Sequence, residues 1–153
     1  MRLRTRLALG AVLTAGLMAA QPVVAAQAAA VDFAADSGDQ CRRGVTEGTL
    51  DWVEGPVIRP AVQVKGTLAD DPATSVCAPD QMHSQAVFHA YHGASLVDSE
   101  VAKADDGTVE LAFDLSDASG VRTIDRVVVQ VCRYSNTPVG IGYCGKAVEY
   151  KSP

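Results

Sequence analysis

Four cysteines, at positions 41, 77, 132 and 144, are the residues of this chain best suited to redox or metal chemistry. None of them forms a Cys-x-x-Cys pair, so thiolate metal ligands would have to come from distant positions. An even set in an exported chain favours structural disulfides. Three pairings are open. We favour Cys41–Cys77 and Cys132–Cys144, because the second bond would join two neighbouring strands around the loop 135–142.

Three histidines, His83, His89 and His92, lie close together in the sequence. The last two form a His-x-x-His pair, a spacing that can hold a metal ion. Side chains three positions apart on a strand point to opposite faces, so this pair requires a bend at Tyr91, which Gly93 permits. The three histidines are therefore weak metal candidates, and we expect neither a metal nor another cofactor.

Paired carboxylates occur at Asp70-Asp71, before a proline, and at Asp105-Asp106, before a glycine. Calcium binding or glycoside hydrolysis would use such pairs, but adjacent aspartates before Pro or Gly more commonly form turns. Nucleophilic catalysis has little support, because the chain contains no Gly-x-Ser-x-Gly motif and adjacency gives His83-Ser84 the wrong geometry for proton transfer. We expect a protein that is not an enzyme.

A segment between the last two cysteines has the composition of a contact surface. It carries two tyrosines, which bury much area at low entropic cost, and the disulfide would fix its base. The candidate binding residues are Arg133, Tyr134, Asn136, Ile141 and Tyr143. An ordinary hairpin is the alternative. A second loop, 78–82 after Cys77, would suit a protease inhibitor, which needs a rigid exposed loop beside a disulfide.

The first thirty residues have the pattern of a Sec-type signal peptide. Three arginines precede an uncharged stretch from Leu7 to Ala20, and a tract of small residues follows Pro22. The pattern predicts cleavage after Ala28 or Ala30. The apolar stretch falls short of the roughly 20 residues that a membrane anchor needs. We expect a secreted, extracellular protein with a flexible tail over 31–40 and a single domain over 41–153.

The charge argues against nucleic acid as a partner. The chain has 13 basic and 18 acidic residues, and removal of the leader takes three arginines and no acid, which leaves a net charge of −8. Binding to phosphates requires clustered Lys and Arg, whereas the only adjacent basic pair is Arg42-Arg43. An acidic surface of this kind favours solubility, and we expect a monomer.

Alternation of apolar and polar residues is the main structural signal, and it predicts strands. It runs through 49–53, 62–68, 109–115, 127–132 and 147–151, and more weakly through 85–91 and 95–103. Trp52, Phe88 and Phe113 are the expected core anchors. Turn residues separate the runs, and Asp106-Gly107 gives the strongest hairpin signal.

Seven short strands separated by turns predict an all-β fold, a small antiparallel β-sandwich of immunoglobulin-like type with two disulfides. We expect an extracellular binding or interaction module whose partner is an unidentified extracellular protein or small ligand. The alternatives are a secreted protease inhibitor and a metal-binding or enzymatic domain that uses the three histidines.

Overall fold

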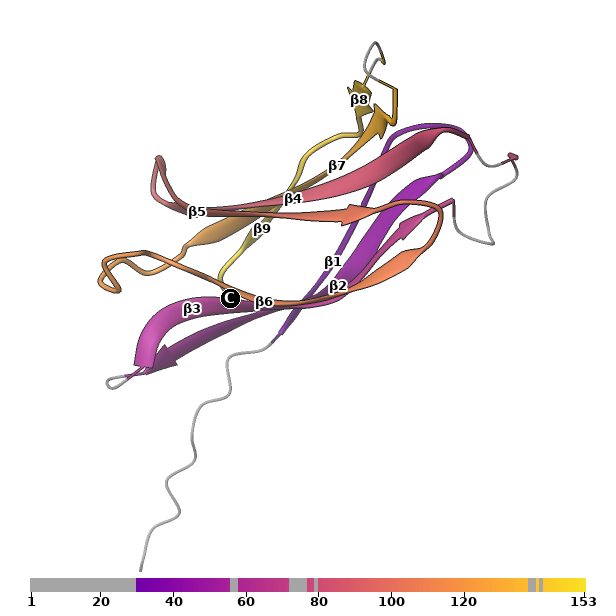
Figure 1. The fold of residues 1–153 in the computed structure, drawn as a ribbon. Helices are drawn as coiled ribbons and strands as arrows, with labels where there is room; N and C mark the ends of the chain where they lie inside the picture. The colour runs from indigo at the N-terminus through magenta and orange to yellow at the C-terminus, as the bar shows by residue number, and fades with distance from the viewer. Residues whose placement is uncertain (1–29, 56–57, 72–76, 79, 138–139, 141) are drawn as a thin grey trace, which may run out of the picture.

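In the part of the chain that the structure describes, nine strands form two antiparallel sheets (Figure 1). The computed structural model describes residues 30–55, 58–71, 77–78, 80–137, 140 and 142–153. Sheet A has the order β1-β2-β3-β6, and sheet B has the order β5-β4-β7-β8, with β9 also paired to β7. The strands are β1 (Val31–Asp36), β2 (Gly44–Gly55), β3 (Ile58–Asp70), β4 (Met82–His92), β5 (Ser95–Ala104), β6 (Thr108–Ser116), β7 (Arg126–Ser135), β8 (Gly142–Cys144) and β9 (Val148–Lys151).

The two facing sheets confirm the predicted all-β sandwich, although the described residues form nine strands rather than about seven. The strand order differs from that of immunoglobulin constant domains, in which the second strand pairs with the fifth. Here β2 pairs with β3 in a long hairpin, from Gly44 opposite Asp70 to Gly55 opposite Ile58. The chain then forms β4 and β5 in sheet B, returns to sheet A for β6 and ends in sheet B.

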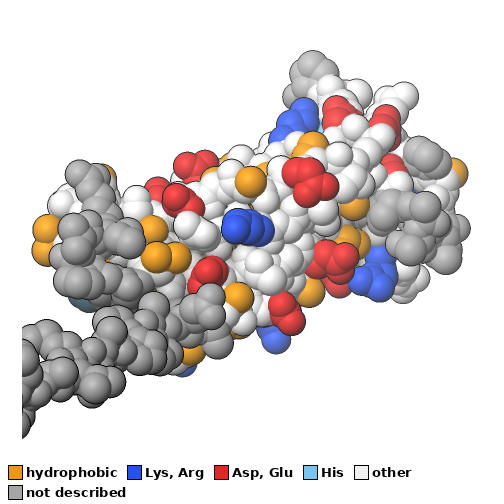
Figure 2. All heavy atoms as spheres, turned by 90° about the horizontal axis from the view of Figure 1, so that it is seen from below, with side chains coloured by type: hydrophobic (Ala, Val, Ile, Leu, Met, Phe, Trp, Pro, Cys, Tyr) orange, Lys and Arg blue, Asp and Glu red, His pale blue; other side chains and the backbone are white. Residues whose placement is uncertain are grey.

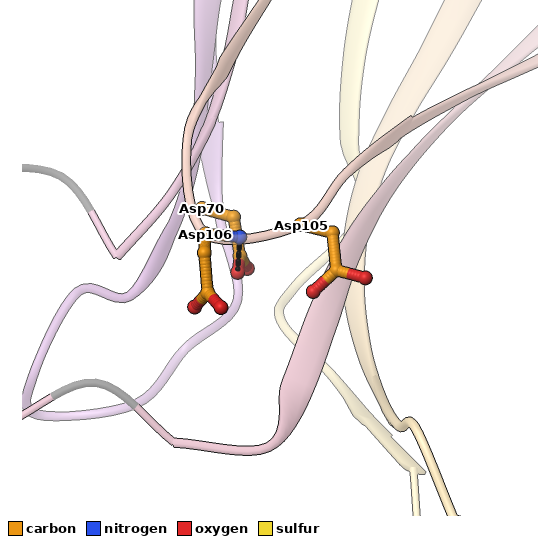
Figure 3. Close-up of side chains that lie close together, drawn as sticks. All are labelled: Asp70, Asp105 and Asp106. Carbon is orange, nitrogen blue, oxygen red and sulfur yellow. Dashed lines mark hydrogen bonds between the residues drawn. The ribbon is translucent and has the colours of Figure 1, made fainter.

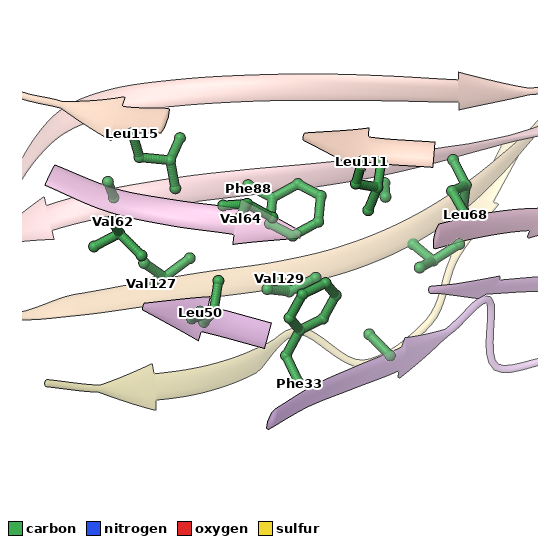
Figure 4. Packing of buried hydrophobic residues seen from close by; sticks show 14 of the residues in the cluster. Phe33, Leu50, Val62, Val64, Leu68, Phe88, Leu111, Leu115, Val127 and Val129 are labelled. Carbon is green, nitrogen blue, oxygen red and sulfur yellow. The ribbon is translucent and has the colours of Figure 1, made fainter. Parts of the chain in front are cut away.

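The alternating residues of the sequence face one another between the sheets, as Figure 4 shows. Apolar side chains of β2, β3, β4, β6 and β7 are buried there, because every second residue of a strand points to the same side. Trp52 and Phe88 are buried, and Phe113 is partly buried with its ring centroid 5.2 Å from that of Phe88. The Trp52 indole also donates a hydrogen bond to the Ile124 carbonyl at 3.0 Å.

The predicted flexible tail is wrong for its first six residues. They form β1, and Phe33 is buried, with its ring centroid 5.5 Å from that of Phe88. The Tyr150 hydroxyl of β9 occupies the free edge of β1, since it accepts from the Ala34 amide at 2.9 Å and donates to the Ala34 carbonyl at 2.8 Å. Pairing with β2 and this edge contact decide the conformation, and neither partner is adjacent in sequence.

The predicted hairpin at Asp106-Gly107 is also wrong, although the turn itself is present. Asp106 has a positive φ of 49°, as such turns allow. The strands on either side nevertheless pair in different sheets, β5 with β4 and β6 with β3. The turn therefore carries the chain from one layer of the sandwich to the other. Local sequence specifies the turn, whereas long-range pairing decides which strand each side joins.

Both predicted disulfides are confirmed. Cys41 bonds to Cys77 with 5.5 Å between their Cα atoms, and Cys132 bonds to Cys144 with 3.9 Å. The second pair lies at opposed positions of β7 and β8.

The predicted signal peptide, up to residue 29, lies outside the described residues. Within the part of the chain that the structure describes, no helix is long and apolar enough to cross a membrane.

Candidate interaction site

The β7–β8 hairpin carries the residues that the sequence singled out as a contact surface. Its described ladder has three pairs, Cys132 opposite Cys144, Arg133 opposite Tyr143 and Tyr134 opposite Gly142. Directly opposed residues of an antiparallel pair point to the same side, so this register decides where each side chain goes. The predicted contact residue Ile141 lies outside the described residues.

Arg133, predicted to make external contacts, is instead fully buried. It continues the inward-facing series of β7 after Val127, Val129 and Val131, which has period two. Its Nη1 lies 3.0 Å from Asp70 Oδ1, and its Nη2 donates to Asp80 Oδ1 at 2.7 Å. A buried cation requires such partners. The side chain anchors the hairpin from within.

The ionic cluster around Arg133 joins four separate parts of the chain. Asp71 lies 3.7 Å from Arg133 Nη2, and Arg43 bonds to the Asp80 carboxylate and lies 3.6 Å from Asp71. Burial by itself would lower the pKa of Arg133, but the carboxylates of Asp70, Asp80 and Asp71 together raise this pKa above its ordinary value. The guanidinium is therefore a permanent charge that holds the end of β3 and the segment before β4 against β7, and Arg43 joins the segment before β2 to the same carboxylates.

Tyr134 points away from the core, on the outer face of sheet B, and is 38 % exposed. Its ring lies over β8 at Gly142, where an added Cβ would come within 2.6 Å of the ring. On its other side is the ring of His83, the opposed residue on β4, with 5.9 Å between centroids. The glycine and the histidine together fix the orientation of an exposed aromatic ring.

Tyr143 points to the opposite side of the hairpin, on the same side as Arg133, and is 39 % exposed. Its hydroxyl donates to Asp39 Oδ2 at 3.3 Å. Burial and the Asp39 charge raise the pKa of Tyr143 above its ordinary value. Burial also raises the pKa of Asp39, but hydrogen bonds from Ser37, the Arg43 amide and Tyr143 lower it more, and the net direction is downward.

This arrangement predicts the direction of a titration. Tyr143 should ionise at a higher pH than a free tyrosine, and Asp39→Asn should lower its pKa, because a nearby negative charge opposes formation of the phenolate. Phenolate absorbance, taken as the difference between each protein and its Tyr143→Phe counterpart, isolates this residue from the other tyrosines. An unchanged midpoint in the Asp39→Asn protein would show that the carboxylate has no influence on the phenol.

Asn136 is exposed, yet its amide already has protein partners. Its Oδ1 lies 2.6 Å from His83 Nδ1, and its Nδ2 donates to Asp105 Oδ1 at 3.1 Å. The Asn136 backbone amide donates to the Gln81 carbonyl at 2.9 Å. Asn136 therefore fastens the end of β7 to β4 and to the turn after β5, which leaves the tyrosines as the residues free to make contacts.

The predicted aspartate pairs meet at this end of the sandwich. Figure 3 shows Asp70, Asp105 and Asp106, each with a carboxylate oxygen within 4.8 Å of the others. Carboxylates this close could hold a cation. However, Asp70 Oδ1 accepts from Ser84 Oγ at 2.5 Å and pairs with Arg133, and Asp70 Oδ2 accepts from the Asp106 amide at 3.0 Å. Both carboxylate oxygens of Asp70 therefore already have protein partners, which join the turn at Asp106 to the ionic cluster.

The three histidines are not brought together. His83 and His89 share the outer face of β4, but six residues separate them, about 20 Å along a strand. His92 lies at the end of β4, with Nδ1 2.9 Å from the Thr123 carbonyl. His89 Nδ1 lies 3.0 Å from the hydroxyl of Ser99, its cross-strand partner on β5. Among the described residues, no hydrogen-bond acceptor orients the other ring nitrogen of His89.

The segment 78–82, the candidate inhibitory loop, is tied to the ionic cluster at its described positions. The Ala78 carbonyl accepts from Arg43 Nη2 at 2.7 Å, and the Asp80 carboxylate binds both Arg43 and Arg133. Met82 begins β4. Pro79 lies outside the described residues. These contacts bind the segment to the body of the sandwich.

Sequence reasoning missed Asp39, Asp80 and Arg43 as partners of the hairpin. No local pattern marks them, because they lie far from β7 in the sequence and only the fold brings them close. A signal for the burial of Arg133 did exist, since its position has the inward-facing parity of the valines before it.

No family model matches this chain. No curated protein and no solved structure gives a significant match either.

Proposed function

We propose that this protein is an exported, non-enzymatic binding module that binds an extracellular protein partner through its β7–β8 hairpin. One observation carries the proposal, namely the three consecutive residues at the end of β7. Cys132 is bonded to β8, Arg133 is locked in the buried ionic cluster, and Tyr134 is displayed to solvent. A rigid aromatic side chain loses little entropy on binding, which favours affinity.

The hairpin displays one tyrosine on each side, and this suggests the shape of the partner. Tyr134 lies on the outer face of sheet B, whereas Tyr143 lies on the opposite side near Asp39. A flat surface could contact only one of the two rings. A concave partner that receives the end of the hairpin could bury both, and tyrosine is enriched in such contacts.

Export is part of the proposal and rests on two features. The amino-terminal residues have the signal-peptide pattern, and all four cysteines are paired in disulfides. Structural disulfides persist in oxidising compartments outside the cytosol. Intact-mass measurement of the protein from culture medium should give a mass that corresponds to cleavage after Ala28 or Ala30 and to the loss of four thiol hydrogens.

The binding proposal predicts the outcome of a capture experiment. Immobilised mature protein should retain a specific extracellular partner, and replacement of both Tyr134 and Tyr143 by alanine should weaken this binding about 100-fold or more, since two central aromatic contacts would be lost. The affinity for the isolated partner would be measured by titration calorimetry. Each single replacement should weaken the affinity by an intermediate amount if the partner contacts both tyrosines.

The matched control is Val121→Ala, which removes an exposed apolar side chain (78 % exposed) from the loop that precedes β7, at the other end of that strand. This variant should bind as the wild type does. All variants should unfold within about 1 kcal/mol of the wild type, as surface changes usually do. Undiminished capture by the double tyrosine variant would refute the hairpin as the binding site.

A further inference from the structure

The two outer faces of the sandwich differ sharply in charge. Among the side chains that the structure describes, sheet A presents six outward-facing carboxylates and one cation, Lys65, and Figure 2 shows acidic side chains spread around a central basic one on this side. The carboxylates belong to Asp32, Asp36, Glu47, Asp51, Glu110 and Asp114. None of the six forms an ion pair with another described residue. Two copies of this face would repel each other, since the described charges of each are mostly negative.

The outer face of sheet B is apolar at its centre and nearly balanced in charge. Val101 on β5, Val87 on β4 and Val128 on β7 point outward, with Leu96 opposite Tyr91 further along. Val101 is 55 % exposed and Leu96 is 51 % exposed. The charged groups of this face lie toward its margins and are already paired, Arg126 with Glu149 at 3.3 Å, Lys151 with Glu149 at 3.6 Å and Lys103 with Asp105 at 3.9 Å.

This face is large enough for a specific interface. With a rise of about 3.4 Å per residue and a strand spacing of about 4.8 Å, β4 and its neighbours cover about 34 Å by about 19 Å, roughly 650 Å². Two such faces in contact would bury roughly 1,300 Å², within the range of specific interfaces. An apolar centre with a polar margin is also the usual anatomy of an interface.

We propose that the outer face of sheet B is a self-association surface, and that its occupant is the same face of a second copy of this chain. Two-fold pairing places like apolar patches together, and it leaves the two acidic sheet A faces on opposite outer sides of the dimer. A face-to-back arrangement would instead press the sheet A carboxylates against the paired charges of sheet B. The net charge of −8 opposes association, so the dimer is expected to be weak and dependent on concentration.

The test is sedimentation of the oxidised, processed protein over a concentration series from about 1 µM to about 1 mM, the range in which weak dimers form. We expect a monomer–dimer equilibrium that stops at the dimer. Added salt should strengthen it, because salt screens the repulsion between acidic copies. Val101→Asp should raise the dissociation constant roughly tenfold or more, since it places a charge in an apolar interface.

Ala112→Asp is the matched control, because it adds the same charge at an exposed, outward-facing position of β6 in sheet A. It should leave the dissociation constant within about threefold of the wild-type value, since a charge that far from the contact is largely screened. A protein that stays monomeric throughout the series, larger assemblies, or equal effects of the two aspartates would overturn the proposal. The Tyr143→Ala variant tests the hairpin separately, because Tyr143 lies on the side of the hairpin away from the outer face of sheet B, so that either proposal can fail alone.

Discussion

Replacing Arg133 by methionine should destabilise the protein by about 3–5 kcal/mol, the usual cost of leaving a buried charge without its partner. Asp70 is as fully buried as Arg133, and its carboxylate lies 3.0 Å from the guanidinium. Without the cation, Asp70 keeps only its hydrogen bonds from Ser84 and the Asp106 amide. Since small domains have about 5–15 kcal/mol of stability in total, the loss should be plain in urea denaturation under oxidising conditions.

Arg126→Met is the matched control. Arg126 also lies on β7 and pairs with a carboxylate, Glu149 at 3.3 Å, but both side chains are partly exposed. Its replacement should cost no more than about 1 kcal/mol, as for other surface ion pairs. If Arg133→Met destabilises no more than this control, the cluster does not anchor the hairpin.

A double variant tests the pairing itself. Asp70→Asn combined with Arg133→Met removes both buried charges, so the double variant should be more stable than the sum of the two single losses predicts. A simple sum would mean that Arg133 and Asp70 stabilise the fold independently. Arg133→Met should also weaken partner capture, because it loosens the base of the hairpin.

Removal of the Cys41–Cys77 disulfide should cost about 4 kcal/mol, and removal of Cys132–Cys144 about 3 kcal/mol, since the loop-closure model gives the larger effect to the longer loop. The sequence separations are 36 and 12 residues. Paired Cys→Ala variants, compared with the wild type by urea denaturation, would measure both. Loss of both bonds should leave the domain with little or no net stability.

The two disulfides should differ in their effect on binding. Cys132–Cys144 joins β7 to β8, a strand of three residues that carries Tyr143, so its loss should impair partner capture in protein that remains folded. Cys41–Cys77 closes a loop beside the ionic cluster and should affect stability more than affinity. Equal binding by both folded variants would argue against the hairpin as the rigid element of the site.

Strand alternation and cysteine count together determined much of this fold. Period-two burial requires two facing layers, and this followed from the valine-rich runs without any tertiary information. The Cys132–Cys144 bond was foreseeable because the two residues flank one loop, as hairpin partners do. The tyrosines of that loop were recognisable as contact residues from their type, although whether they bind a partner remains a prediction.

The tertiary structure alone decided which strands pair and where each side chain of the hairpin points. Residues 31–36 become a strand only through β2 and Tyr150, and the Asp106 turn joins two layers because β5 and β6 find partners elsewhere. Arg133 is buried because three carboxylates, distant in sequence, converge on its position. Local propensity depends on neighbours along the chain, whereas burial and ion pairing depend on neighbours in space, and no window of the sequence contains those.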